Sequence, residues 1–135
     1  MGRVCDATPA AELSLPQEQG SARAARRFLS EASCPVHRAR ALDEAQLLVT
    51  ELVTNAVRYG CPPLTVRVEC DGGTGLRVWV GDGAEDLPVR REVPLEAEGG
   101  RGVALVDILS DRWGVLPRRD PFTGPGGKIV WFVLS

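Results

Sequence analysis

The sequence lacks several features that mark common classes of protein. It contains no hydrophobic run of transmembrane length, and its first residues lack the apolar segment of a secretory signal peptide. Its formal charge is -2, and its aromatic residues are three Trp, one Tyr and three Phe. A nucleic-acid surface built from basic and stacking side chains is therefore not expected. We expect a cytoplasmic protein that contacts neither a membrane nor nucleic acid directly.

Cysteine and histidine are also scarce. The chain has no Cys-x-x-Cys pair, and its four cysteines are Cys5, Cys34, Cys61 and Cys70. Reduced thiols are the expectation, with a structural disulfide or a metal site as the alternatives. The only histidine, His37, lies in a proline-containing break after the first predicted helix, where a lone histidine is more often a surface residue than a catalyst.

The length and composition favour one domain. A chain of 135 residues with 44% hydrophobic residues can bury a substantial core, and two domains are not expected. We assign residues 1–10 to a flexible N-terminal tail and residues 11–135 to the domain.

Hydrophobic periodicity predicts helices and strands in a mixed order. The predicted helices cover residues 21–32, 43–59 and 103–113, and the predicted strands cover 11–16, 64–70, 76–80, 115–116 and 128–134. The second helix is expected to begin at a capping box of Asp43 and Gln46 and to end at Gly60. The glycine-rich turn 71–75 predicts an antiparallel hairpin, and the apolar last strand is expected to be central. Together these elements predict an α+β two-layer sandwich with a mostly antiparallel sheet.

The second predicted helix carries a polar line on an otherwise apolar segment. Glu51, Asn55 and Arg58 share one helix face, since residues three and four apart are neighbours there. Such a line faces water in most amphipathic helices. If it is buried instead, its carboxylate and carboxamide must meet partners or line a cavity.

Two downstream features favour a nucleotide site. Asp82 ends the second strand of the hairpin, and residues 84–99 form a predicted mobile loop closed by Gly99-Gly100-Arg101-Gly102. Carboxylate and amide oxygens suit Mg²⁺ together with phosphate and water. A buried aspartate can accept a hydrogen bond from an exocyclic amine, and glycines before a helix let the backbone approach phosphates.

With these motifs the chain resembles the GHKL (histidine kinase-like) ATPase superfamily, and in particular the small stand-alone proteins related to anti-sigma factor serine/threonine kinases. Residues 51–58 resemble the N box, residues 80–83 the first glycine box, and residues 99–105 the second glycine box. The resemblance implies the Bergerat fold and an ATP-binding domain over residues 11–135, with ATP and Mg²⁺ as ligands.

The resemblance also implies roles for individual residues. Asn55 would be the Mg²⁺ ligand, Glu51 the general base, and Asp82 the residue that reads adenine. Gly100 and Gly102 would form the hinge of a lid over the phosphates. The remaining expected nucleotide contacts are Arg58, Gly83, Arg101 and Val103.

The first glycine box departs from the family pattern. That pattern reads Asp-x-Gly-x-Gly, whereas Asp82 is followed by Gly83-Ala84-Glu85-Asp86, so neither expected position holds glycine. The departure concerns the backbone on the adenine side, and it leaves the aspartate in place.

Three functions are compatible with the resemblance. The first is a serine/threonine kinase that phosphorylates a STAS-like anti-sigma antagonist, binds a sigma factor and forms a homodimer. The second is a non-catalytic module in which ATP only sets the shape of the lid. The third is an inherited fold that has lost its nucleotide. A histidine kinase is disfavoured, because His37 precedes the N box and no two-helix dimerisation segment is present in this sequence.

Overall fold

The computed structural model describes residues 10–70, 75–84, 101–120 and 124–135. The predicted N-terminal tail (residues 1–10) and the predicted loop (residues 84–99) lie outside these residues except for Ala10 and Ala84, and Gly100 lies outside them as well. Cys5 and the turn over residues 71–74 also lie outside them. The assignment of the whole chain to one domain stays a prediction.

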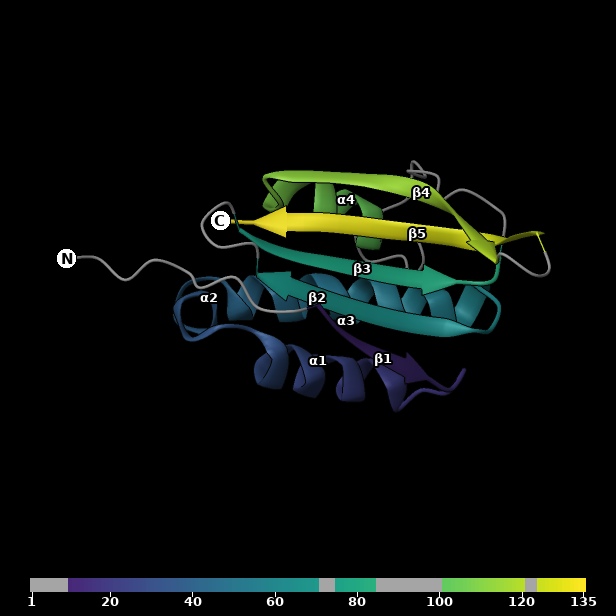
Figure 1. Ribbon diagram of the computed structural model, residues 1–135, viewed down its shortest axis with the longest axis horizontal. Coiled ribbons are helices and arrows are strands. Elements are labelled where there is room, and N and C mark those ends of the chain that lie inside the picture. The colour runs from purple at the N-terminus through teal and green to yellow at the C-terminus, as the bar shows by residue number, and fades with distance from the viewer. Residues whose placement is uncertain (1–9, 71–74, 85–100, 121–123) are drawn as a thin grey trace.

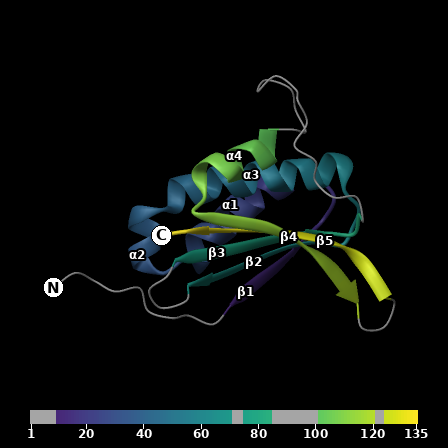
Figure 2. The same cartoon turned by 90° about the horizontal axis from the view of Figure 1, so that it is seen from above.

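The described elements form two layers. In chain order they are β1 (Ala11–Leu15), α1 (Ser21–Ala32), α2 (Pro35–Arg40), α3 (Leu42–Tyr59), β2 (Leu64–Cys70), β3 (Leu76–Asp82), α4 (Arg101–Leu109), β4 (Arg112–Asp120) and β5 (Gly124–Leu134). The strands make a five-stranded sheet in the order β1-β2-β3-β5-β4, and every neighbouring pair is antiparallel (Figure 1). The helices cover one face of this sheet (Figure 2). The predicted α+β two-layer sandwich is confirmed.

Helix α3 supplies much of the core. Its buried residues recur at intervals of three and one, so they form a single face, and they are Ala45, Leu48, Val49, Leu52, Val53 and Ala56. The predicted end of the helix at Gly60 is confirmed. The predicted capping box is wrong, because the N-cap is Ala41 and the Gln46 side chain instead donates to the carbonyl of Arg26, at 3.0 Å.

The sheet residues that face the helices form the rest of the core. In β2 and β3 every second residue is buried, as period-2 alternation requires, and Val66, Val68, Val78 and Val80 belong to this set. Strand β5 lies between β3 and β4, as its apolar sequence predicts, and its Phe132 is fully buried.

The sequence predictions miss one helix and misplace a boundary. Helix α2 occupies the segment that was expected to be a break, because Pro35 suits the first turn and the Cys34 side chain accepts a hydrogen bond from the backbone N–H of His37. Helix α4 ends at Leu109, and Trp113 and Gly114 lie in β4 opposite Phe132 and Trp131. Strand pairing therefore overrides the helical pattern there.

Among the described residues, no helix combines the length and hydropathy that a membrane crossing requires.

Candidate functional site

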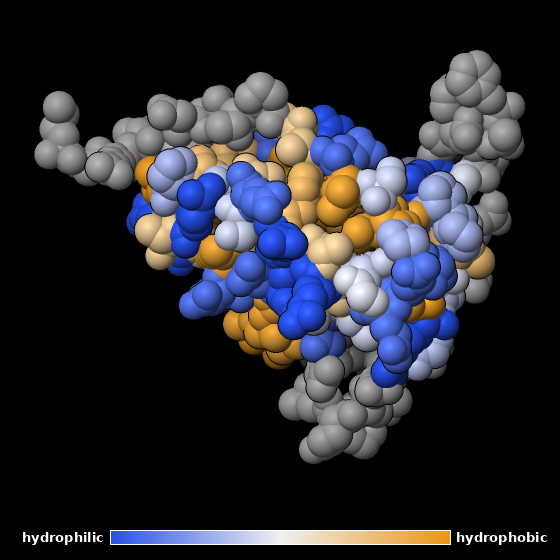
Figure 3. All heavy atoms as spheres, turned by 90° about the horizontal axis from the view of Figure 1, so that it is seen from below, coloured by the Kyte–Doolittle hydropathy of each residue, from blue (hydrophilic) through white to orange (hydrophobic). Residues whose placement is uncertain are grey.

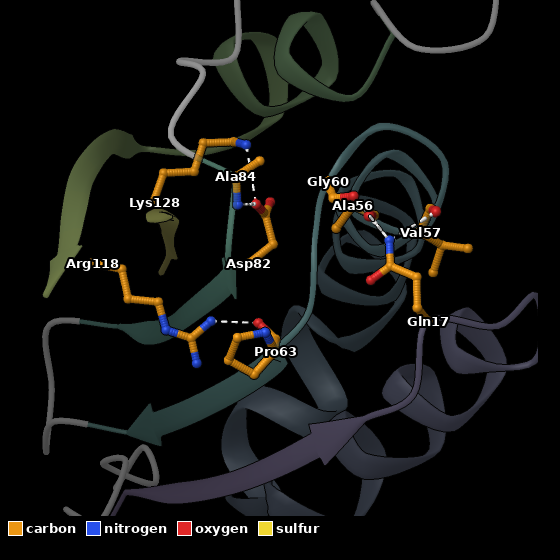
Figure 4. Close-up of polar contacts among 9 residues, drawn as sticks. All are labelled: Gln17, Ala56, Val57, Gly60, Pro63, Asp82, Ala84, Arg118 and Lys128. Atoms are coloured by element: carbon orange, nitrogen blue, oxygen red, sulfur yellow. Dashed lines mark hydrogen bonds and ion pairs between the residues drawn. The ribbon is translucent and has the colours of Figure 1, made fainter. Parts of the chain in front are cut away.

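Asp82 lies at the end of β3 and is the most buried acidic side chain among the predicted site residues. Its Oδ1 accepts a hydrogen bond from the backbone N–H of Ala84 at 2.7 Å. The ammonium of Lys128, the only lysine in the sequence, lies 3.2 Å from the same oxygen (Figure 4). The side chains of Lys128 and Asp82 are 13% and 7% exposed, so this ion pair is largely shielded from water.

The register of the sheet creates this ion pair. Strands β3 and β5 place Lys128 directly opposite Asp82. Gly127, one residue earlier, has a φ of +124°, a conformation that L side chains rarely adopt, and its Cα approaches the backbone of Asp82 too closely for any side chain. Lys128 can lie next to Asp82 because residue 127 is glycine.

The C-terminal end of α3 forms the opposite wall. A Cβ added to Gly60 would lie 2.9 Å from Cγ and 3.1 Å from Oδ2 of Asp82, so the aspartate packs against the end of the helix that carries the N box. Among the described residues, the hydrogen bonds to the carboxylate go to Oδ1. An ionised carboxylate has about four acceptor positions, so Oδ2 can still accept a donor from a ligand.

Gln17 holds that end of α3, and no sequence motif points to this role. Its Nε2 lies 2.7 Å from the carbonyl oxygen of Ala56, 2.9 Å from that of Val57 and 3.2 Å from that of Gly60 (Figure 4). The last carbonyls of a helix lack the usual partners in a following turn, and a side-chain amide can supply one. The carbonyl of Ala56 also accepts the backbone N–H of Gly60, at 2.9 Å. The connection between β1 and α1 thereby fixes the wall of the Asp82 site.

The polar line of the N box lies on this same helix. Glu51 and Asn55 are half-buried, and Arg58 is exposed. Asn55 precedes Gly60 by five residues, which is about 1.4 helical turns. Glu51 and Asn55 therefore lie between solvent and the buried face of the helix, rather than fully on a water-facing stripe. Their predicted roles stay predictions.

The altered first glycine box keeps the aspartate in place. The backbone N–H of Gly83 donates to the carbonyl of Cys61 at 2.5 Å, and a side chain at position 83 would collide with the backbone of Pro62. Ala84 is buried, and its N–H is the donor that holds Asp82. Alanine at this position is thus compatible with a fixed carboxylate.

The second glycine box is only partly described. Arg101, Gly102 and Val103 form the first turn of α4, which packs against α3. The N box and the second glycine box therefore lie on neighbouring helices. The contacts of the second glycine box with a nucleotide stay predictions.

A separate shallow groove lies between β1 and α1. Figure 3 views this side of the molecule and shows hydrophobic residues exposed between hydrophilic ones. The groove has a volume of about 380 Å³ and is lined by Leu13, Gly20, Arg23, Ala24, Arg27, Phe28 and Glu31. It contains none of the predicted site residues.

Comparison with known families decides the assignment. The profile of the histidine kinase-like ATPase domain matches residues 15–134. The chain belongs to this family. The match spans almost all of the sequence and includes the N box, Asp82 and both glycine boxes. No curated protein matches the sequence significantly.

Membership of the histidine kinase-like ATPase family supports two of the predictions. It places the chain in the GHKL superfamily, and it supports ATP as the ligand. Mg²⁺ is typical of such domains. The resemblance to anti-sigma factor kinases is narrower than this family and stays a prediction.

Proposed function

We propose that this ATPase domain is a serine/threonine protein kinase of the anti-sigma factor type. It would bind ATP with Mg²⁺, phosphorylate a STAS-like anti-sigma antagonist and bind a sigma factor, and it would work as a homodimer. The order of the N box and the two glycine boxes along one family-matched chain supports this proposal.

The contacts around Asp82 are the observation that supports nucleotide binding. Its carboxylate is fixed by a backbone N–H and by Lys128, and it packs against Gly60. A fixed, buried acceptor with a remaining lone pair selects a ligand that offers an N–H donor. The exocyclic amine of adenine has this chemistry. Guanine presents a carbonyl at the equivalent position, although its own N–H groups lie nearby.

The residues of α3 fit a hard divalent cation. Glu51 and Asn55 offer carboxylate and amide oxygens from successive turns of one helix, and both are half-buried. Mg²⁺ takes few protein oxygens and completes its coordination with phosphate and water. Asn55 would hold the ion, which when bound neutralises charge on the phosphates.

Glu51 would act as the general base. Its carboxylate would accept the proton of the substrate serine or threonine hydroxyl as that oxygen attacks the γ-phosphorus. The bond from the γ-phosphorus to the bridging oxygen breaks, and ADP leaves. Arg58 and Arg101 would contact the phosphates, and positioning with electrostatic stabilisation would supply most of the rate.

A phosphotransfer assay tests this proposal. The full chain is incubated with γ-labelled ATP, Mg²⁺ and purified STAS-like antagonists. We expect label on an antagonist serine or threonine, and a loss of about 10²–10⁴-fold for Glu51→Gln. The matched control is Glu44→Gln, an exposed position on the same helix. Bound ATP without transfer to any antagonist would contradict the kinase assignment.

The altered first glycine box favours one alternative. Ala84 and Asp86 stand where the family pattern has glycine, as expected of a binding module that has weak nucleotide affinity or none. This alternative predicts that Glu51→Ala leaves partner capture in a pull-down intact. Loss of capture by a folded Glu51→Ala variant would count against it.

A further inference from the structure

At the opposite end of the sheet from Asp82, two cysteines and the only histidine come together. Cys34 precedes α2, His37 lies in α2 and Cys70 ends β2. Antiparallel pairing sets the end of β2 beside the start of β3, whereas Asp82 ends β3. Figure 1 shows β2 ending beside α2. The expectation that His37 is a surface residue is wrong, since it is 4% exposed.

The donor atoms of this cluster are close enough for one metal ion. The ligand atoms of Cys34, His37 and Cys70 all lie within 4.8 Å of one another. The Cys34 sulfur lies 3.2 Å from Nδ1 of His37. Sulfur and nitrogen ligands about 2.0–2.3 Å from a tetrahedral zinc ion are roughly 3.5–3.8 Å apart. Shifts of about 1 Å or less would bring the three donors to these separations.

Main-chain N–H groups point at both sulfurs. The backbone N–H of His37 points at the Cys34 sulfur at 3.5 Å, and the backbone N–H of Cys34 points at the Cys70 sulfur at 3.4 Å. Hydrogen bonds from main-chain N–H groups stabilise negative charge on an acceptor. Two thiolates and a neutral imidazole around a divalent ion carry no net charge, so the whole group can stay buried.

We propose that Cys34, His37 and Cys70 bind Zn²⁺, with water in the fourth position. Sulfur and imidazole donors select zinc over Mg²⁺, so this site and the proposed nucleotide site take different ions. Binding releases the thiol protons and links the connection between α1 and α2 to the end of β2. The proposal does not depend on the proposed function.

Cobalt spectroscopy tests the site. The reduced, metal-free full chain is titrated with Co²⁺, which adopts the same geometry. We expect thiolate-to-cobalt charge-transfer absorption that saturates at one ion per chain and disappears when Zn²⁺ is added. Cys70→Ser should remove it, whereas the control variant Cys5→Ser/Cys61→Ser should keep it. Absence of this absorption in the wild type, or its loss in the control variant, would overturn the proposal.

A second measurement covers the case in which Cys70→Ser does not fold. The thermal midpoint of the wild type is compared in Zn²⁺ and in chelator. Zn²⁺ at about 100 times its dissociation constant should raise the midpoint by the order of 10 °C. An unchanged midpoint would overturn the site. A Cys34–Cys70 disulfide that forms in air, in a protein that takes up no metal when reduced, would also overturn it.

Discussion

The two ends of the sheet, one at Asp82 and the other at Cys70, stabilise their buried reactive side chains in different ways. Near Asp82 the chain buries opposite charges, and it makes room for them with glycines at positions 60 and 127. Near Cys70 it buries soft donors, and backbone N–H groups serve the sulfurs. Helix α3 runs between the two ends and ends against Asp82. The charged end suits a ligand with phosphates and a hydrogen-bonding base, whereas the sulfur end suits a metal ion.

The largest effect on stability is expected from breaking the charged pair. Lys128→Met leaves Asp82 buried without its cation, and we expect a loss of about 3–5 kcal/mol in the free energy of unfolding, measured with urea. The control is Arg27→Met, which breaks the Arg27–Glu31 pair, whose side chains are 84% and 71% exposed. That change should be about 0.5 kcal/mol or less. Equal losses in the two variants would remove the distinction between a shielded and an exposed pair.

The next effect comes from the backbone at the same end. Gly127→Ala puts a side chain at a positive φ and against the backbone of Asp82. We expect it to lower the free energy of unfolding by about 1–3 kcal/mol. It should also weaken ATP binding, because it displaces Asp82. Gly20→Ala is the control, since no atom lies within 4 Å of its added Cβ. A Gly127→Ala variant as stable as Gly20→Ala in calorimetry would contradict the close approach.

A smaller effect is expected where α3 meets the charged end. Gln17→Ala removes the amide that serves the last carbonyls of the helix, and we expect a loss of about 1–2 kcal/mol. Hydrogen exchange should quicken in the last turn of α3 and stay unchanged near Cys70. The control Gln19→Ala alters an exposed position and should change neither. Faster exchange at both ends of the sheet would show that the ends are not independent.

The smallest effect is expected at the third described cysteine. Cys61 is exposed and lies near Asp82 rather than near Cys70. Cys61→Ser should change the free energy of unfolding by less than about 0.5 kcal/mol. Its Co²⁺ spectrum should equal that of the wild type. A weaker spectrum would indicate that Cys61 binds the metal, which would contradict a site at the Cys70 end of the sheet.

The Asp82 end of the sheet was easier to predict from the sequence than the Cys70 end. Helix α3 and the β2–β3 hairpin have long periodic patterns, and Asp82 is the last residue of such a strand, so local sequence suffices to find them. The partner of Asp82 depends on the register of β5, and the role of Gln17 depends on how the chain packs after β1. Neither the partner of Asp82 nor the role of Gln17 can be predicted from local sequence.

The sulfur end shows the same limit. Cys34 and His37 are three residues apart, but α2 has only six residues and contains a proline, so it reads as a break. Cys70 is 36 residues away from Cys34, and only the packing of the helices on the sheet brings it close. The boundary between α4 and β4 was misplaced for a related reason, because pairing with β5 decides it.

The most direct test of the central claim is calorimetric titration of the full chain with ATP, with and without Mg²⁺. We expect binding that requires Mg²⁺ and that weakens at least about tenfold in Asp82→Asn, since one good hydrogen bond to a charged group is worth about 1.5–3 kcal/mol. Asp43→Asn, an exposed change on α3, should bind as the wild type does. Absence of heat at several temperatures from a folded protein, or equal affinity in Asp82→Asn and Asp43→Asn, would contradict the assignment of Asp82 as the residue that reads the base.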